Sequence, residues 1–124
     1  MPPFAFPRSA RLLRRAEYVA VKEGGRSFAD GPLAASWRPR DGSVTRPGIA
    51  QGVARVGLTV SSKVGGAVVR NRVRRRLREA VRLELSQLPA VDLVIVARSA
   101  ATSSSVDDLR GWLRRAAARM RGTP

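Results

Sequence analysis

The chain has 124 residues and a formal net charge of +15, because 24 lysine and arginine residues face only nine acidic residues. This length predicts one domain, and so large a charge predicts an anionic partner: nucleic acid, an anionic membrane or another polyacid. The chain contains no cysteine and no histidine, which excludes disulfides, thiol nucleophiles, Ser-His-Asp triads and metal sites built on these residues.

The sequence carries no membrane or export signal. No apolar run reaches the roughly 18–20 residues that span a bilayer. The proline-broken segment Met1–Arg8 is too short for a signal peptide. We therefore expect a cytoplasmic protein without a membrane partner.

The first third of the chain predicts an irregular arm, a helix and one or two strands. Residues 1–10 hold three prolines and no periodicity. Helical spacing of apolar residues predicts a helix over 14–23, which the pair Gly24-Gly25 ends. The apolar positions of this pattern are Leu12, Leu13, Ala16, Val19 and Ala20. Ser27–Arg38 can form one strand or two, broken at Asp30-Gly31-Pro32.

The middle of the chain predicts a loop followed by a strand–helix–strand unit. Residues 39–51 consist mostly of turn-forming residues and indicate a mobile loop. Val53–Val60 has the composition of a strand. Residues 67–88 repeat apolar side chains at helical spacing up to Pro89. The apolar run in Asp92–Ala97 suits a strand that is covered on both faces.

The C-terminal part predicts a polar linker and a final helix. Ser105 and Asp108 form a capping box, with Ser104 and Asp107 as the alternative register. Residues 121–124 form a flexible tail. The predicted order α-β-β-β-α-β-α indicates an α+β fold, a two-layer sandwich in which three helices pack on a small mixed sheet.

The predicted helix over 67–88 carries a dense group of arginines. Seven of them lie between residues 70 and 82, where only Glu79 opposes them. On a helical wheel, one contiguous wedge contains Arg70, Arg74, Arg75, Arg78 and Arg82, with Asn71 among them. Like charges four residues apart destabilise a helix, so we interpret this wedge as a phosphate-binding face. The preceding Gly65-Gly66 fits a phosphate-binding amide and a simple turn equally well.

The stretch from Arg55 to Glu79 resembles the signature of the protein subunit of bacterial ribonuclease P. Its core is the motif Arg70-Asn71-Arg72, followed by Arg74-Arg75 and Arg78-Glu79. Weaker matches extend the resemblance over about residues 11–120, which would form a single domain. The resemblance implies a left-handed βαβ crossover and a ribonucleoprotein that removes the 5′ leader from precursor tRNA. The large RNA with bound Mg²⁺ would perform the chemistry.

The resemblance also assigns roles to particular residues. The side chains expected to bind the catalytic RNA are Arg70, Asn71, Arg72, Arg74, Arg75 and Arg78. An opposite cleft, between the first helix and the open face of the sheet, would hold the single-stranded leader of precursor tRNA. The cleft residues would be Tyr18, Lys22, Ser61, Ser62, Lys63 and Arg98. The protein itself is expected to supply no catalytic residue, metal ligand or cofactor site.

The cleft departs from the family pattern at three positions. Lys22 stands where the family has a second aromatic ring, and Ser61 and Ser62 stand where it has basic residues. Trp37 could supply the missing ring, although core burial is the interpretation that we favour. Phe28 and Trp112 fit core or edge packing.

Three other classes of protein compete with this interpretation. A ribosomal protein that binds rRNA would show the same charge and fold. A DNA-binding protein would need a helix-turn-helix, but a predicted strand precedes the arginine helix. A nuclease made of protein alone would need acidic metal ligands, and the nine carboxylates are scattered along the chain.

Overall fold

The computed structural model describes residue 6 and residues 10–12, 14–39 and 54–121. The main elements in this part are α1 (Arg15–Gly24), β1 (Arg26–Asp30), β2 (Leu33–Pro39), β3 (Arg55–Thr59), α2 (Ala67–Glu84), β4 (Val91–Ala97) and α3 (Val106–Arg121). Two short 3-10 helices follow α2 and β4. The predicted order of elements and the α+β class are confirmed. The predicted loop over 39–51 lies almost entirely outside the described residues, as do most of the arm and the tail.

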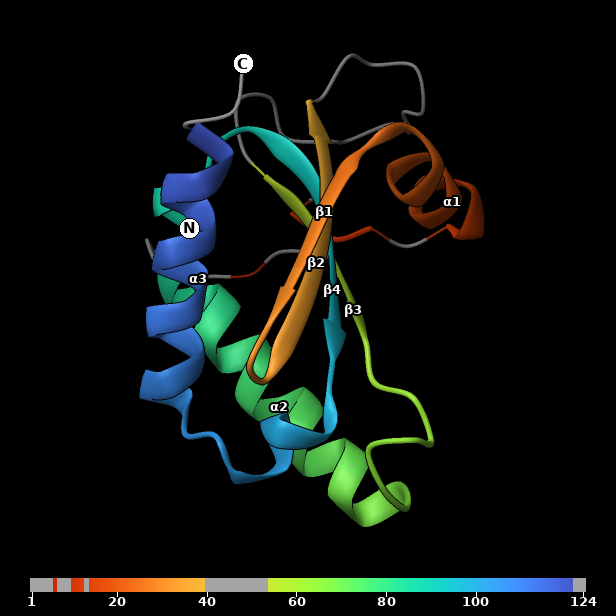
Figure 1. Cartoon of the computed structure of the whole chain (residues 1–124), viewed down its shortest axis with the longest axis vertical. Helices are drawn as coiled ribbons and strands as arrows, with labels where there is room; N and C mark the ends of the chain where they lie inside the picture. Colours follow the sequence, from red (N-terminus) through yellow and green to blue (C-terminus); the bar gives the residue numbers. More distant parts are fainter. Residues whose placement is uncertain (1–5, 7–9, 13, 40–53, 122–124) are drawn as a thin grey trace.

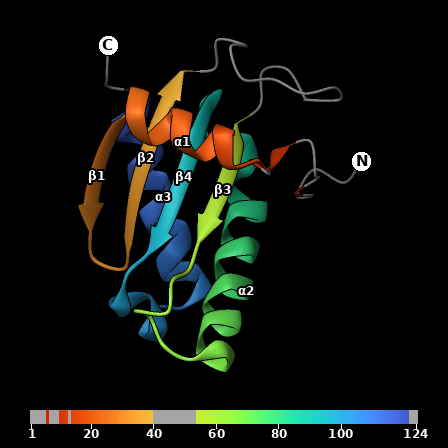
Figure 2. The same ribbon diagram turned by 90° about the vertical axis from the view of Figure 1, so that its right-hand side faces the viewer.

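The strands form one mixed sheet in the order β1-β2-β4-β3. β1 and β2 form a hairpin, β2 pairs antiparallel with β4, and β3 pairs parallel with β4. Helix α1 crosses one face of the sheet, and α2 and α3 cover the other (Figures 1 and 2). Seen from the α1 side, β3 and β4 both point downward, α2 lies behind them and β4 stands to the left of β3 (Figure 2). The β3–α2–β4 crossover is therefore left-handed, against the usual rule.

The main core lies between the sheet and the pair α2 and α3. The buried face of α2 consists of Val73, Leu77, Ala80 and Val81, as the apolar periodicity predicts. Strand β4 is buried on both faces, which confirms the prediction from its apolar run. Helix α2 ends at Glu84 rather than at residue 88, because the chain tightens there into the 3-10 turn Leu85–Gln87.

Helix α3 begins at the predicted capping box. The backbone N–H of Ser105 donates to the Asp108 carboxylate (2.9 Å), and the N–H of Asp108 donates to the Ser105 hydroxyl (3.0 Å). The alternative register at Ser104 and Asp107 is not used. The predicted polar linker before this helix is partly ordered as the 3-10 helix Ser99–Ser103.

Sequence periodicity identifies the wrong face of α1. Ala16 and Val19 are exposed, whereas Glu17 and Val21 are buried. Val21 packs in a small second cluster with Leu12 and Val94, on the sheet face opposite the main core. The pattern fails because the residue at the centre of the buried face is a carboxylate, which a hydrophobicity count assigns to solvent.

The two tryptophans belong to the core. Trp37 is 5% exposed, and its ring meets Phe28 edge-on with 5.5 Å between the centroids. Phe28 stacks on Trp112, whose indole N–H donates to the Asp30 carbonyl oxygen (2.8 Å). Trp37 therefore does not replace the ring that is missing at Lys22, and the core interpretation of these aromatic residues is confirmed.

Candidate RNA-binding surfaces

One side of α2 carries arginines and faces solvent. Asn71, Arg72, Arg75 and Arg78 are exposed, and Arg70 and Arg74 are partly exposed. Within this face Arg74 donates one hydrogen bond to the Asn71 side-chain oxygen (3.0 Å). These six side chains are the ones that the sequence predicts to bind RNA, and the fold brings them to one surface. We call this surface the arginine face.

Two other arginines of α2 are held by the protein itself. Arg76 donates to the carbonyl oxygens of Thr102 and Ser104 (3.2 and 3.4 Å) and so ties α2 to the segment before α3. Arg82 pairs with Glu79, and this hydrogen bond lowers the pKa of the Glu79 carboxyl. Arg82 lies in the wedge that the helical wheel predicts, but Glu79 binds its guanidinium.

Tyr18 of α1 is fixed against the backbone of β3. A Cβ atom at Gly57 would lie 2.6 Å from two carbons of the tyrosine ring, so only glycine at this position lets the ring approach the sheet. The Tyr18 hydroxyl donates to the Leu12 carbonyl oxygen (3.2 Å). Burial raises the pKa of this hydroxyl, against the lowering effect of a hydrogen bond from the Leu58 backbone. The ring is half-buried and packs against the cluster of Leu12, Val21 and Val94.

A buried ion network holds α1 on the sheet next to Tyr18. Arg55 of β3 binds the Asp92 carboxylate of β4 with two hydrogen bonds (2.7 and 2.5 Å) and Glu17 of α1 with a third (2.8 Å). All three side chains are at most 3% exposed. The second oxygen of Glu17 accepts the backbone N–H of Arg14 (2.8 Å) and caps the start of α1. One carboxylate therefore sets both where α1 begins and where it docks.

The predicted cleft residues fall into separate groups. Ser61, Lys63 and Arg98 line one hollow of about 510 Å³, together with Val96 of β4. Val96 also packs against the cluster that contains Tyr18, so the sheet surface connects this hollow with the tyrosine. Lys22 is exposed on α1 and Ser62 is exposed after β3, and neither lines this hollow.

The floor between Tyr18 and this hollow is made of small side chains. Val96 pairs in register with Ala34 on one side and Thr59 on the other. All three are partly exposed. The open face of the sheet is therefore shallow and uncharged, with cations at one end and an aromatic ring at the other.

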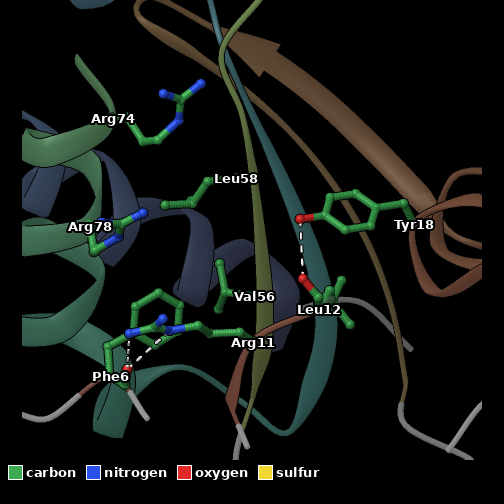
Figure 3. A pocket seen from close by; sticks show the side chains of 8 residues that line it. All are labelled: Phe6, Arg11, Leu12, Tyr18, Val56, Leu58, Arg74 and Arg78. Atoms are coloured by element: carbon green, nitrogen blue, oxygen red, sulfur yellow. Dashed lines mark hydrogen bonds between the residues drawn. The ribbon is translucent and has the colours of Figure 1, made fainter. Parts of the chain in front are cut away.

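A cavity of about 250 Å³ at the outer edge of β3 is shared by the two predicted sites. Tyr18 lines it from the α1 side, and Arg74 and Arg78 line it from α2 (Figure 3). The two arginines extend from α2 toward β3, and Tyr18 reaches the strand from its other side (Figure 3). The sequence predicts these residues on opposite surfaces. In the structure the surfaces meet at the edge of β3.

Sequence reasoning missed the Glu17–Arg55–Asp92 network. Its members stand 37 and 38 residues apart and share no motif, so only the fold brings them together. A weak signal was present only at Asp92, because it lies in a strand that the sequence predicts to be covered on both faces. Gly57 was also missed, since a glycine in a strand has several explanations.

In the part of the chain that the structure describes, no group of three or more carboxylates could hold a metal ion. No helix among the described residues is long and apolar enough to cross a membrane.

The α+β fold and the arginine face define a small basic RNA-binding protein. The sequence model of the family described as Ribonuclease P matches residues 6–121. The ribonuclease P protein component of Gluconacetobacter diazotrophicus is 42% identical over 118 residues, which cover 90% of this chain and 95% of the relative. That of Citrifermentans bemidjiense is 41% identical over 96 residues, covering 77% and 75%.

Solved structures show the same fold. The RNase P protein of Staphylococcus aureus aligns with a TM-score of 0.70 at 22% identity, over 91% of this chain and 95% of the other. The RNase P protein of Thermotoga maritima aligns with a TM-score of 0.71 at 22% identity, over 88% and 96%. The chain belongs to the ribonuclease P protein family. It is thus an RNA-binding component of a tRNA-processing ribonucleoprotein endoribonuclease, whose other part is the ribonuclease P RNA.

Proposed function

We propose that the protein holds two RNAs at once, the catalytic RNA on the arginine face and the leader of precursor tRNA on the open sheet face beside Tyr18. The observation that carries this proposal is the cavity at the edge of β3, which Tyr18 and Arg74 line together. Two RNAs bound on these surfaces would lie close to each other. The protein would then set the position of the leader relative to the catalytic RNA.

Electrostatics explains why such a subunit is useful. Two polyanions repel each other at close range, and each phosphate that an arginine neutralises releases condensed counterions. The arginine face supplies cations on one side of β3, and Lys63 and Arg98 supply them at the far end of the sheet face. The protein lowers the cost of bringing substrate and catalyst together.

The sheet face suits a leader of variable sequence. Tyr18 offers one ring face, and stacking of an unpaired base contributes roughly 1–3 kcal/mol for any base. The floor of Ala34, Thr59 and Val96 presents no ionic group that would select a base. Because Lys22, Ser61 and Ser62 replace rings and charges of the family pattern, this cleft depends more strongly on Tyr18, Lys63 and Arg98.

The chemistry is assigned to the RNA and its Mg²⁺ ions. The buried carboxylates of the described chain are bound to arginines: Glu17 and Asp92 to Arg55, and Glu84 to Arg110 and Arg114. A carboxylate bound in this way is not available to ligate a metal or to abstract a proton. We place the activity in the cytoplasm, where precursor tRNA is made.

Reconstitution tests this proposal. Purified protein freed of RNA should cleave no precursor tRNA with or without Mg²⁺, and addition of the ribonuclease P RNA should give leader removal. RNA captured with the protein from cell extract should contain one dominant species of several hundred nucleotides, on the order of the size expected for a structured catalytic RNA. Cleavage by the protein alone, or capture of rRNA only, would contradict the proposal.

A further inference from the structure

The cavity at the outer edge of β3 combines arginines with an apolar wall, and the binding of phosphates on the two RNA surfaces does not require such a wall. β3 is the last strand of the sheet, and its outer edge is covered only in part, by a hydrogen bond from the Leu12 N–H to the Val56 carbonyl oxygen (3.0 Å). Beyond this bond, the cavity opens between β3 and α2 (Figure 3).

Among the described residues, the charged side chains that line the cavity are all arginines. Arg74 and Arg78 come from α2, and Arg11 comes from the segment before α1. Arg11 is anchored by two hydrogen bonds to the Phe6 carbonyl oxygen (3.2 and 2.7 Å) and lies over the Phe6 ring. Arg78 has no hydrogen-bond or ion-pair partner in the described part of the chain. The cavity therefore attracts an anion, and none of the described residues that line it is a carboxylate.

The remaining wall of the cavity is apolar. Leu58 packs against the main core and is also partly exposed into the cavity, and Val56 lies buried beside it on the same strand. A surface that only neutralised phosphates would gain nothing from an exposed leucine, since contact with phosphate leaves the apolar area in water. Arginines beside an apolar wall fit a ligand that joins a phosphate to a flat apolar group.

We propose that this cavity binds one unpaired nucleotide, with its phosphate on Arg74 and Arg78 and its base against Leu58. The volume of about 250 Å³ equals that of roughly eight water molecules at ~30 Å³ each. This space admits one nucleotide and excludes a double helix. The proposal rests on the proposed function, which supplies two sources for the nucleotide. It belongs either to the leader, where the leader passes Tyr18, or to the catalytic RNA on the arginine face.

Filling the cavity separates this proposal from simple charge attraction. Leu58→Trp fills the space without removing a cation, and Leu58→Ser removes the apolar wall without adding bulk. Each should weaken binding of precursor tRNA by the reconstituted holoenzyme, or binding of the catalytic RNA, about five- to tenfold with an unchanged salt dependence. Ala118→Trp adds the same ring to the exposed surface of α3 and is the matched control, with no change in affinity.

The outcomes test the nucleotide cavity separately from the proposed function. Full affinity of both Leu58 variants, together with weakened binding by Arg74→Ala, would overturn the nucleotide cavity and leave the proposed function intact. Failure of the unmodified protein to bind either RNA would overturn the proposed function itself. Circular dichroism of each variant checks that the fold is retained.

Small probes test the chemistry of the cavity directly. Adenosine 5′-monophosphate added to the isolated protein should shift the NMR signals of both the Leu58 methyl groups and the Arg78 guanidinium. Inorganic phosphate should shift only the Arg78 signal. Identical responses to the two probes, or no response at Leu58, would show that no base contacts the wall.

Cross-linking identifies the source of the nucleotide. A benzophenone side chain at position 58 of the reconstituted holoenzyme should cross-link to an unpaired nucleotide, in the leader or in the catalytic RNA. Either product supports the cavity and assigns its occupant. Cross-links confined to base-paired stems, or a holoenzyme without cross-links at full activity, would refute the proposal.

Discussion

Helices α2 and α3 are both rich in arginine, with seven arginines in α2 and five in α3, but they differ in what these side chains contact. On α3, Arg110 and Arg114 bind the buried carboxylate of Glu84, and Arg119 lies over the Phe28 ring. On α2, five of the seven arginines bind no carboxylate and no carbonyl oxygen of the backbone among the described residues; the other two are Arg76 and Arg82. Arginine density alone therefore does not identify an RNA-binding face. The partners that the fold provides decide which cations remain for RNA.

The strongest test of this comparison replaces Arg55, a buried arginine that is bound by two carboxylates of the protein. Arg55→Met leaves the carboxylates of Glu17 and Asp92 buried without their cation. We expect a loss of about 3–5 kcal/mol in the free energy of unfolding, measured by urea denaturation. Asp92→Asn should cost less, because the pair Arg55–Glu17 survives. A loss below about 1 kcal/mol for Arg55→Met would show that the network is not what holds α1 on the sheet.

The second test concerns Glu84, whose carboxylate binds Arg110 and Arg114 of α3. Burial by itself would raise the pKa of Glu84, but hydrogen bonds from Arg114 and Arg110 outweigh it and hold this pKa below the ordinary value. A carboxyl with a lowered folded-state pKa stabilises the fold at pH values above its unfolded pKa, about 4.3. That contribution is lost as the pH falls through the lower folded-state pKa.

Glu84→Gln should remove this contribution. We expect it to cost about 1–3 kcal/mol at neutral pH and to flatten the decline of stability between about pH 4.3 and lower pH. The same variant should remove the negative charge that Arg110 and Arg114 share, and so raise nonspecific RNA binding at low salt. If acid denaturation of the variant follows the unmodified protein, Glu84 is not the titrating group.

The third test separates the cleft from the arginine face. Tyr18→Ala should weaken binding of precursor tRNA by roughly 1–3 kcal/mol and leave mature tRNA unaffected, because only the precursor carries a leader. Equal weakening of both substrates with the fold intact would assign Tyr18 to packing. Tyr18→Phe keeps the ring but loses the hydrogen bond to Leu12. It should bind normally and lose about 0.5–1.5 kcal/mol of stability.

The smallest expected change in stability comes from the solvent-facing arginines. Arg74→Ala and Arg78→Ala should each change the free energy of unfolding by at most about 0.5 kcal/mol. Each should also lower the slope of log affinity against log salt for the catalytic RNA by about one unit. Arg76→Ala is the matched control on the same helix, since Arg76 already binds two carbonyl oxygens, and it should leave the slope nearly unchanged. Equal slopes for all three variants would contradict the comparison.

The sequence was sufficient to predict those elements whose structure depends on a local pattern of residues. The apolar repeats of α2 and α3, the buried strand β4 and the capping box at Ser105 were all predictable, because each depends on residues within a few positions. The position of the arginines on the solvent side of α2 was predictable for the same reason, and their binding to RNA stays a prediction. The orientation of α1 was not, since it depends on Glu17 meeting Arg55, 38 residues further along the chain.

Pairing between charged side chains was the other quantity that the sequence did not show. The helical wheel places Arg82 among the arginines of one wedge, and the structure shows that it is this arginine that Glu79 binds. The meeting of Tyr18 with Arg74 and Arg78 at one cavity depends on the edge position of β3 in the sheet. Strand order is a property of the complete topology, and the local motifs carry no information about it.

The ion network also imposes an order on folding. Arg55 and Asp92 come together only when β3 pairs with β4 across the whole α2 crossover, and closing such a long loop is slow compared with forming a helix. Until then Glu17 has no buried cation to bind, and α1 has no fixed place on the sheet. The arginine face lies on the single helix α2, so it needs only contacts between residues close in sequence. The surface that we propose for the catalytic RNA can therefore form before the cleft that we propose for the leader.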